Sequence, residues 1–182
     1  MGQGWCARVL RQLSPQSYGP GAGVPSLSWI GQERIAIGSV PPAGSVAGLA
    51  SQGVTHVVNC RTYGQVWLRG DLAAERAIFG LARVAHAPMQ DLGLRQRPQL
   101  WAQAACFAAR VLDDQPQARV LIHCSAGRRR SVMLAYAVLR LRGRAADEAA
   151  ALVLRYRTEA QLVPAYVHSV EQWLARERPA LS

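Results

Sequence analysis

The chain has 182 residues, enough for one domain with a buried core and too few for two. Half of its residues are hydrophobic, and 21 basic residues against 11 acidic ones give a net charge of +10. Every basic residue is arginine, which excludes chemistry that needs a lysine, such as a Schiff base or a P-loop lysine.

The first segment of the chain, residues 1–28, is predicted to be a flexible N-terminal arm. Its second half, from residue 14 to residue 28, is rich in serine, proline and glycine. Regular patterning starts at Trp29, so residues 29–178 are assigned to one domain. Within it, short apolar and β-branched runs predict strands at Arg34–Gly38, Thr55–Cys60, Arg83–Pro88 and Arg119–His123.

Longer stretches with helical periodicity lie between and after these strands. The Val66–Leu81 stretch, for example, carries Leu68, Leu72, Ala73, Ala77 and Leu81 on one side. The predicted helices are Ser45–Gln52, Val66–Leu81, Pro98–Leu112, Ser131–Arg142, Ala145–Arg157 and Pro164–Arg176.

This order predicts an α/β fold with a mainly parallel central sheet of four to five strands flanked by helices, followed by an all-helical C-terminal third. Ligands of such sheets bind beyond the carboxyl ends of the strands. The residues that follow Asn59 and His123 are therefore well placed for function before any motif is considered.

The most informative segment runs from the apolar strand before His123 to Ser131, as His-Cys-Ser-Ala-Gly-Arg-Arg-Arg-Ser. Cys124 comes directly after the strand, Gly127 three residues later, and Arg130 at the expected start of a helix. A cysteine five residues before an arginine means little in so arginine-rich a chain. The full pattern, with His123 before the cysteine and Ser131 after the arginine, is not expected by chance.

Each residue of this segment has a chemical role. Converging backbone N–H groups at a helix N-terminus stabilise a thiolate at Cys124 and cradle a phosphoryl group. Arg130 can hold two phosphate oxygens through its planar guanidinium, and Ser131 can donate a hydrogen bond to the sulfur. His123 is expected to orient the loop. The predicted phosphate-binding residues are His123, Ser125, Ala126, Gly127, Arg128, Arg129 and Arg130.

The His-Cys-x5-Arg-Ser pattern of residues 123–131 resembles the dual-specificity phosphatase family of the cysteine-based protein tyrosine phosphatase superfamily. The resemblance covers roughly residues 29–176 and is specific at the loop. It implies a hydrolase that removes phosphate from phosphotyrosine and from phosphoserine or phosphothreonine through a phosphocysteine intermediate. It also implies that no cofactor and no metal is needed.

The resemblance further implies a general acid and base, an aspartate on a loop roughly thirty residues before the cysteine. Asp91 lies 33 residues before Cys124 and follows a predicted strand. Its rivals fit worse, because Asp71 lies within a helical pattern and Asp113 and Asp114 close a helix just before the catalytic strand.

Two other functions stay open on the sequence alone. Arg128 and Arg129 could favour multiply charged substrates, such as a phosphoinositide head group, in place of a phosphorylated protein. The non-enzyme alternative is a module that binds phosphate anions or nucleic acid. No basic stripe with interleaved aromatic residues supports nucleic acid as a partner, and the exclusion of lysine indicates compositional bias in the charge.

The four cysteines, Cys6, Cys60, Cys106 and Cys124, include no Cys-x-x-Cys pair, which argues against a structural zinc site and a disulfide framework. A cytoplasmic location is therefore expected. No run of about 18 apolar residues occurs, so no transmembrane segment is expected. Cys60 lies at the end of the predicted strand Thr55–Cys60, so we expect it near the loop. Its thiol is either an inert buried group or, as in some members of the superfamily that the loop resembles, a partner that protects Cys124 through a disulfide.

Overall fold

The computed structural model describes residues 26–42 and 44–181, so most of the predicted N-terminal arm lies outside the described residues. A five-stranded sheet forms the centre of the molecule, with the strand order β1-β2-β5-β3-β4. β1 pairs antiparallel with β2, and the other neighbours are parallel. The strands are β1 (Leu27–Trp29), β2 (Ile35–Gly38), β3 (His56–Asn59), β4 (Val84–His86) and β5 (Val120–His123).

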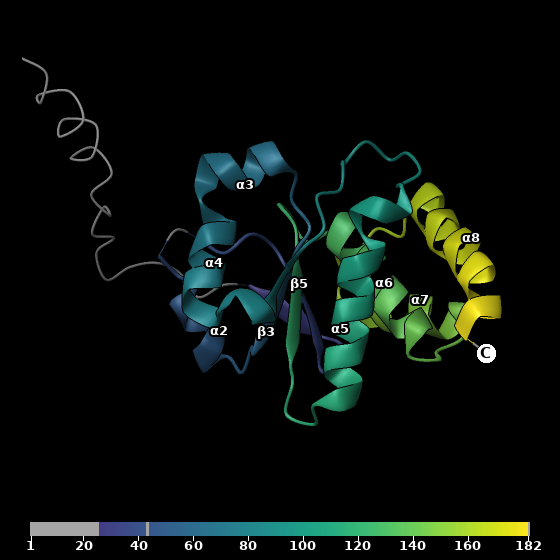
Figure 1. Ribbon diagram of the computed structural model, residues 1–182, viewed down its shortest axis with the longest axis horizontal. Helices are drawn as coiled ribbons and strands as arrows, with labels where there is room; N and C mark the ends of the chain where they lie inside the picture. The colour runs from purple at the N-terminus through teal and green to yellow at the C-terminus, as the bar shows by residue number, and fades with distance from the viewer. Residues whose placement is uncertain (1–25, 43, 182) are drawn as a thin grey trace, which may run out of the picture.

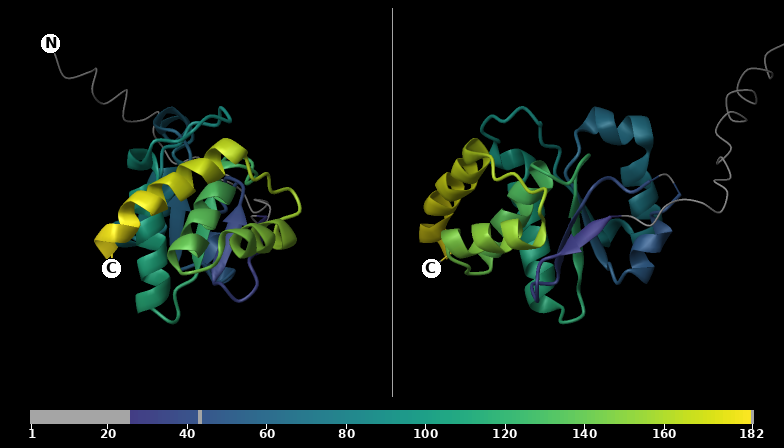
Figure 2. Two further views of the ribbon diagram at one scale, coloured as in Figure 1. Left: turned by 90° about the vertical axis from the view of Figure 1, so that its right-hand side faces the viewer. Right: turned by 180° about the vertical axis from the view of Figure 1, so that it is seen from behind.

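Helices cover both faces of this sheet, as the sequence predicts (Figures 1 and 2). On one face lie α5 (Ala102–Asp114), α6 (Arg130–Leu141), α7 (Ala146–Tyr156) and α8 (Pro164–Leu181). On the other face lie α2 (Ala47–Ser51), α3 (Tyr63–Arg69) and α4 (Asp71–Phe79). Two short 3-10 turns, η2 (Leu81–Arg83) and η3 (Pro98–Leu100), precede β4 and α5.

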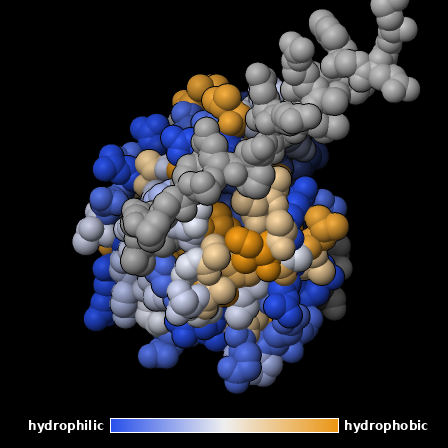
Figure 3. All heavy atoms as spheres, turned by 90° about the vertical axis from the view of Figure 1, so that its left-hand side faces the viewer, coloured by the Kyte–Doolittle hydropathy of each residue, from blue (hydrophilic) through white to orange (hydrophobic). Residues whose placement is uncertain are grey.

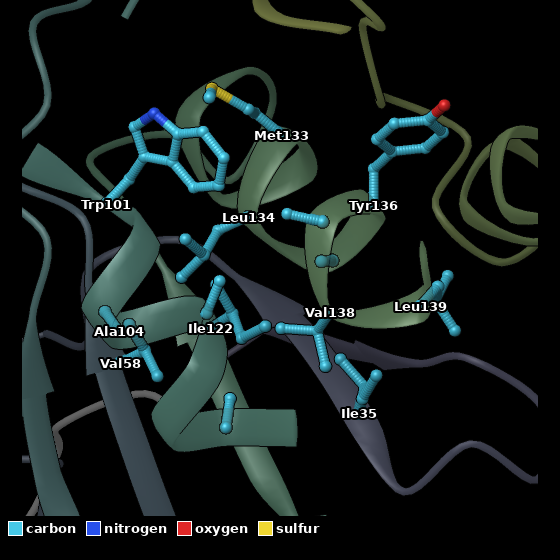
Figure 4. Packing of buried hydrophobic residues seen from close by; sticks show 14 of the residues in the cluster. Ile35, Val58, Trp101, Ala104, Ile122, Met133, Leu134, Tyr136, Val138 and Leu139 are labelled. Carbon is cyan, nitrogen blue, oxygen red and sulfur yellow. The ribbon is translucent and has the colours of Figure 1, made fainter. Parts of the chain in front are cut away.

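Alternation along the strands divides the core into two layers. In β5, Val120 and Ile122 face α5 and α6 in the larger hydrophobic cluster, whereas Leu121 faces the α4 side in the smaller one. Figure 4 shows the larger cluster, in which Leu134 and Val138 of α6 pack close to Ile122. The same alternation turns His123, the last residue of β5, toward α4.

The observed elements differ from the predicted ones in two places. The predicted helix Val66–Leu81 is two helices, because Gly70 adopts a left-handed conformation (φ 67°) that ends α3 and starts α4 in a new direction. Leu68 and Leu81, expected on its buried side, are exposed. The short strand β1 was not predicted, and the predicted arm boundary at residue 28 falls inside it.

The C-terminal part after β5 contains only α6, α7 and α8, which confirms the all-helical third. The last helix extends beyond the predicted end at Arg176. Among residues 26–42 and 44–181, no helix has the length and the apolar composition needed to cross a bilayer.

Candidate active site

The loop between β5 and α6, residues 124–129, is held from outside through its carbonyl groups. The carbonyl of Ser125 accepts a hydrogen bond from the N–H of Val40 (3.2 Å), and that of Arg128 accepts one from the N–H of Gln161 (2.8 Å). Between them, the guanidinium of Arg157 donates to the carbonyls of Ala126 and Gly127 (3.5 and 3.2 Å). With these carbonyls engaged outside, the N–H groups of the loop are left for its inner side.

Gly127 is the tightest point of this loop. Its φ is +69°, and a Cβ there would lie 2.6 Å from the backbone of Gly38 and 2.9 Å from the guanidinium of Arg157. Only glycine satisfies both the backbone conformation and the space. The N–H of Gly127 lies 3.3 Å from the Sγ of Cys124 and donates to it.

The sulfur of Cys124 is buried and lies among hydrogen-bond donors. The hydroxyl of Ser131 is 3.4 Å from Sγ. Burial on its own raises the pKa of a thiol, but the hydrogen bonds from Ser131, the positive charge of Arg130 and the N–H of Gly127 together outweigh it. The pKa of Cys124 is therefore lowered from its ordinary value, which favours the nucleophilic thiolate.

Arg130 starts α6 and is almost fully buried beside the sulfur. One terminal nitrogen donates to the side-chain oxygen of Gln65 (2.9 Å) and to the backbone carbonyl of Cys60 (3.2 Å), and the other donates to the hydroxyl of Ser125 (3.1 Å). Its Nε lies 3.5 Å from a carboxylate oxygen of Asp91. The guanidinium thus connects the loop, α3 and the aspartate.

Asp91 lies in the loop after β4, across a small cavity from the sulfur. The cavity has a volume of about 270 Å³ and is lined by Asp91, Cys124, Ala126, Arg128, Arg129 and Gln161. The hydroxyl of Tyr166 donates to the carboxylate of Asp91 (3.4 Å) and to the carbonyl of Gln90 (3.1 Å), which ties this loop to α8. The structure therefore brings the predicted nucleophile and the predicted acid to one pocket.

No family model and no curated protein matches the sequence of this chain, but solved structures share its fold. Among solved structures, human DUSP28 is similar with a TM-score of 0.66 and 19% identity, covering 87% of this chain and 99% of its own. Kinase-associated phosphatase matches with a TM-score of 0.70 and 15% identity, covering 86% of this chain and 97% of its own. This chain has the dual-specificity phosphatase fold.

A third structure with this fold is PTPMT1 in complex with PI(5)P, with a TM-score of 0.68 and 15% identity, covering 81% of this chain and 94% of its own. The identities are all low, so the likeness concerns the fold. What the site of this chain does has to be argued from its own residues.

His123 was predicted among the phosphate-binding residues and was expected to orient the loop. It is fully buried at the end of β5 and, like Ser125, Gly127 and Arg130, is not among the residues that line the cavity. Its Nε2 is hydrogen-bonded to the carboxylate of Glu75 on α4 (2.7 Å) and not to the loop. Burial opposes a charge on His123, but the adjacent Glu75 outweighs this and raises the pKa of His123 above its ordinary value.

Glu75 belongs to a buried polar network beneath the loop, between β3 and α4. The amide of Asn59 donates to Asp71 (2.8 Å) and to Glu75 (3.1 Å), and Arg61 forms an ion pair with Asp71 (2.5 Å). Asp71, a rejected candidate for the general acid, is thus fixed in an ion pair away from the pocket.

Asp71, Glu75 and His123 also lie close enough together to hold a metal ion. Their polar atoms already have partners, because Arg61 neutralises Asp71 and Glu75 pairs with His123. Placing a divalent cation there would bring it next to the Arg61 guanidinium. We therefore interpret these residues as a structural network and not as a metal site.

Sequence reasoning missed several residues of the site, namely Gln65, Glu75, Arg157 and Gln161. Only Gln65 had a visible signal, since Thr62 and Gln65 form the capping box that starts α3. The side-chain oxygen of Gln161 accepts from Nε of Arg129 (2.9 Å), which holds Arg129 at the pocket. Arg128, the other predicted rim residue, is exposed.

Cys60 lies directly beside the loop, and its N–H donates to the carbonyl of His123 (2.8 Å). Both Cys60 and Cys124 are free thiols, and Cys60 is fully buried. Burial, with a smaller contribution from the neighbouring Cys124, raises the pKa of the Cys60 thiol. The pKa of Cys60 is thus raised and that of Cys124 is lowered, so of these two neighbouring thiols only Cys124 is favoured as a nucleophile.

Proposed function

We propose that this protein is a phosphatase that hydrolyses phosphate monoesters through a phosphocysteine intermediate at Cys124. The observation that carries the proposal is the surroundings of the sulfur. Ser131, Gly127 and Arg130 stabilise it as a thiolate, and Asp91 faces it across the same cavity. The nucleophile, the anion site and the acid are all protein groups, so the reaction requires no metal.

In the first step, the thiolate of Cys124 attacks phosphorus in line with the leaving oxygen. An S–P bond forms and the P–O bond breaks, while Asp91 gives its proton to the leaving alcohol or phenol. The loop N–H groups and Arg130 bind the equatorial oxygens, whose negative charge they match.

In the second step, a water molecule attacks the phosphorus of the phosphocysteine, and Asp91 takes a proton from this water. The S–P bond breaks, and inorganic phosphate and the thiolate are released. Ser131 assists because its hydroxyl donates to the departing sulfur, which lies 3.4 Å away. Asp91 is then protonated again and ready for the next cycle.

For the substrate, a phosphorylated protein is the class that the sequence resemblance favours, with phosphotyrosine and phosphoserine or phosphothreonine as the groups cleaved. A phosphoinositide is the second candidate. It is supported by Arg128 and Arg129, which add positive charge to the rim of the pocket. It is also supported by the fold shared with PTPMT1, which was solved in complex with PI(5)P.

The activity is tested with a small aryl phosphate in the presence of a chelator. Wild-type protein should hydrolyse it, vanadate should inhibit, and Cys124→Ser should have no measurable turnover. Asp91→Ala should slow turnover by about two to four orders of magnitude, the usual scale for a general acid. Asp114→Asn is the matched comparison, because this exposed aspartate at the end of α5 has no ion pair among the described residues and should leave turnover unchanged. Full activity of Cys124→Ser refutes the proposal, because another group must then be the nucleophile. No activity in the wild type also refutes it and favours a phosphate-binding module.

The substrate class is tested with a panel of phosphotyrosine and phosphothreonine peptides and inositol phosphates. Arg128→Ala should raise KM most for the substrates with several phosphates if a phosphoinositide is the natural class. If Arg128→Ala raises KM equally for all substrates, the charge at the pocket rim no longer supports a phosphoinositide as the natural substrate.

A further inference from the structure

Large apolar side chains are exposed on both sides of the catalytic pocket. On α3 these are Tyr63, Trp67 and Leu68, and in the loop after β4 they are Leu92 and Leu94, with exposures between 64% and 85%. Large apolar side chains this exposed are unusual in such numbers on two neighbouring segments, and a group of them marks a binding surface.

These two segments flank the pocket, although no residue of α3 lines the cavity itself. α3 contacts the site through Gln65, which accepts a hydrogen bond from Arg130, and the loop contacts it through Asp91. Figure 1 shows α3 and this loop at the same edge of the sheet, on either side of the carboxyl end of β5. Figure 3, which faces the α2–α4 side, shows exposed hydrophobic groups among hydrophilic ones, including at the top of the molecule.

The charge at this edge is one-sided. Arg69 on α3, Arg95 and Arg97 after Asp91, and Arg128 in the catalytic loop are exposed. None of these four forms an ion pair with another described residue. The segments α3, 88–98 and 124–130 together contain one acidic residue, Asp91.

The opposite edge of the sheet differs. Here lie five of the acidic residues, Glu33, Asp113, Asp114, Asp147 and Glu148, and the arginines Arg142 and Arg144 are paired with Glu33, Asp113 and Glu148. Exposed apolar side chains and exposed arginines without an ion pair also occur elsewhere, for example Leu81 beside Arg83. At the catalytic edge they occur in larger number and on both sides of the loop, and the nearby exposed Glu159 is paired with Arg157.

We propose that the catalytic edge docks on an anionic lipid membrane, with Trp67, Leu68, Leu92 and Leu94 inserted at the interface and the four unpaired arginines against the head groups. Tryptophan, tyrosine and leucine beside arginine are the residues that favour this boundary. A bilayer is also deformable, so it can contact α3 and the loop after β4 at once while the pocket faces a head group.

Docking of this surface on a membrane would make the substrate a phosphate monoester carried by a membrane lipid. This assignment of the substrate class rests on the proposed phosphatase function. Docking itself does not depend on catalysis. The two can therefore fail separately, because binding is measured on Cys124→Ser protein and catalysis on a soluble aryl phosphate.

The first experiment is cosedimentation of the full-length Cys124→Ser protein with vesicles. The vesicles are pure phosphatidylcholine or phosphatidylcholine containing phosphatidylserine, at low and at high salt. Binding is expected only to the anionic vesicles, weakened by salt. Adding Trp67→Ala and Leu68→Ser should lower the affinity by about tenfold or more, the order expected for losing two inserted side chains.

Leu81→Ser is the matched control, because Leu81 is exposed to a similar degree as Leu68 (75% and 79%) but precedes β4 at the opposite edge. It should bind vesicles like its parent. In an otherwise wild-type chain, the Trp67 and Leu68 variants should keep full activity on the aryl phosphate, which shows that they fold. They should lose activity only on a phosphoinositide in vesicles.

Three outcomes overturn the proposal. One is no binding to anionic vesicles, and another is equal loss of binding for the Leu68 and Leu81 variants. The third is a Trp67→Ala defect seen on phosphopeptides in solution and not on vesicles, which assigns the surface to a protein partner.

Discussion

The two faces of the sheet stabilise the molecule in different ways. The face under α5 to α8 is closed by one large apolar cluster that includes almost the whole of α6. The face under α2 to α4 has a small apolar cluster, and beside it the buried network of Asn59, Arg61, Asp71, Glu75 and His123. The apolar face supports the catalytic helix by packing, whereas the network face supports the catalytic strand by hydrogen bonds.

The difference has a consequence for tolerance to change. An apolar cluster loses contacts in proportion to the atoms removed, whereas a polar network fails when a single member leaves a buried charge without its partner. Mutations on the two faces should therefore differ in their dependence on pH as well as in size.

The largest effect is expected for Glu75→Ala on the network face. It leaves the side chain of fully buried His123 without its partner and the amide of Asn59 with only Asp71, which should lower the free energy of unfolding by about 3–5 kcal/mol. Urea unfolding measures this. A loss under about 1 kcal/mol would show that water or a rearranged side chain replaces the carboxylate.

On the apolar face, Leu134→Ala should cost about 2–5 kcal/mol, because Leu134 is completely buried between α6 and the sheet. The matched change, Leu72→Ala in the smaller cluster, should cost less, since Leu72 lies at the edge of its cluster and is slightly exposed. Equal losses would mean that the two clusters are equally well packed.

The pH dependence separates the faces further. Because Glu75 raises the pKa of His123 above its unfolded value, the pair stabilises the folded state fully below the unfolded pKa of about 6.5. That contribution is lost as the pH rises through the folded pKa. The stability difference between wild type and Glu75→Gln should therefore be greatest near pH 6 and shrink at higher pH, while that of Leu134→Ala stays constant.

The smallest effect is expected for Leu68→Ala, which lies on the network face but outside its cluster. Leu68 is exposed, so the free energy of unfolding should change by no more than about 0.5 kcal/mol. Thermal unfolding of Leu68→Ala, measured in parallel with that of Leu134→Ala, checks this small change in stability. A larger loss would show that Leu68 contributes to folding, and its exposure would then need no binding partner to explain it.

The catalytic loop could be predicted from the sequence because its chemistry lies in nine consecutive residues, 123–131. The fold class followed from the alternation of strands and helices. These two features are local, so the sequence displays them directly. Asp91 was expected from the spacing that the family resemblance implies, and the structure has both Asp91 and Cys124 at one cavity.

The supporting residues could not be predicted in this way. Glu75 meets His123 from 48 residues away, and Gln65 meets Arg130 from 65 residues away. Such pairs exist only after the chain has folded, and a single sequence carries no sign of them. The break at Gly70 and the three-residue strand β1 were missed because one glycine and one short edge pairing are weak signals beside a long helical pattern.

The carbonyl contacts of the catalytic loop determine when the site forms during synthesis. Two of the groups that hold the loop, Arg157 and Gln161, lie beyond α7. A nascent chain that ends before them already contains Cys124, Arg130 and Asp91 but not the donors that fix the shape of the loop. The thiol should therefore remain an ordinary cysteine on the ribosome and become a nucleophile only after Arg157 and Gln161 have emerged.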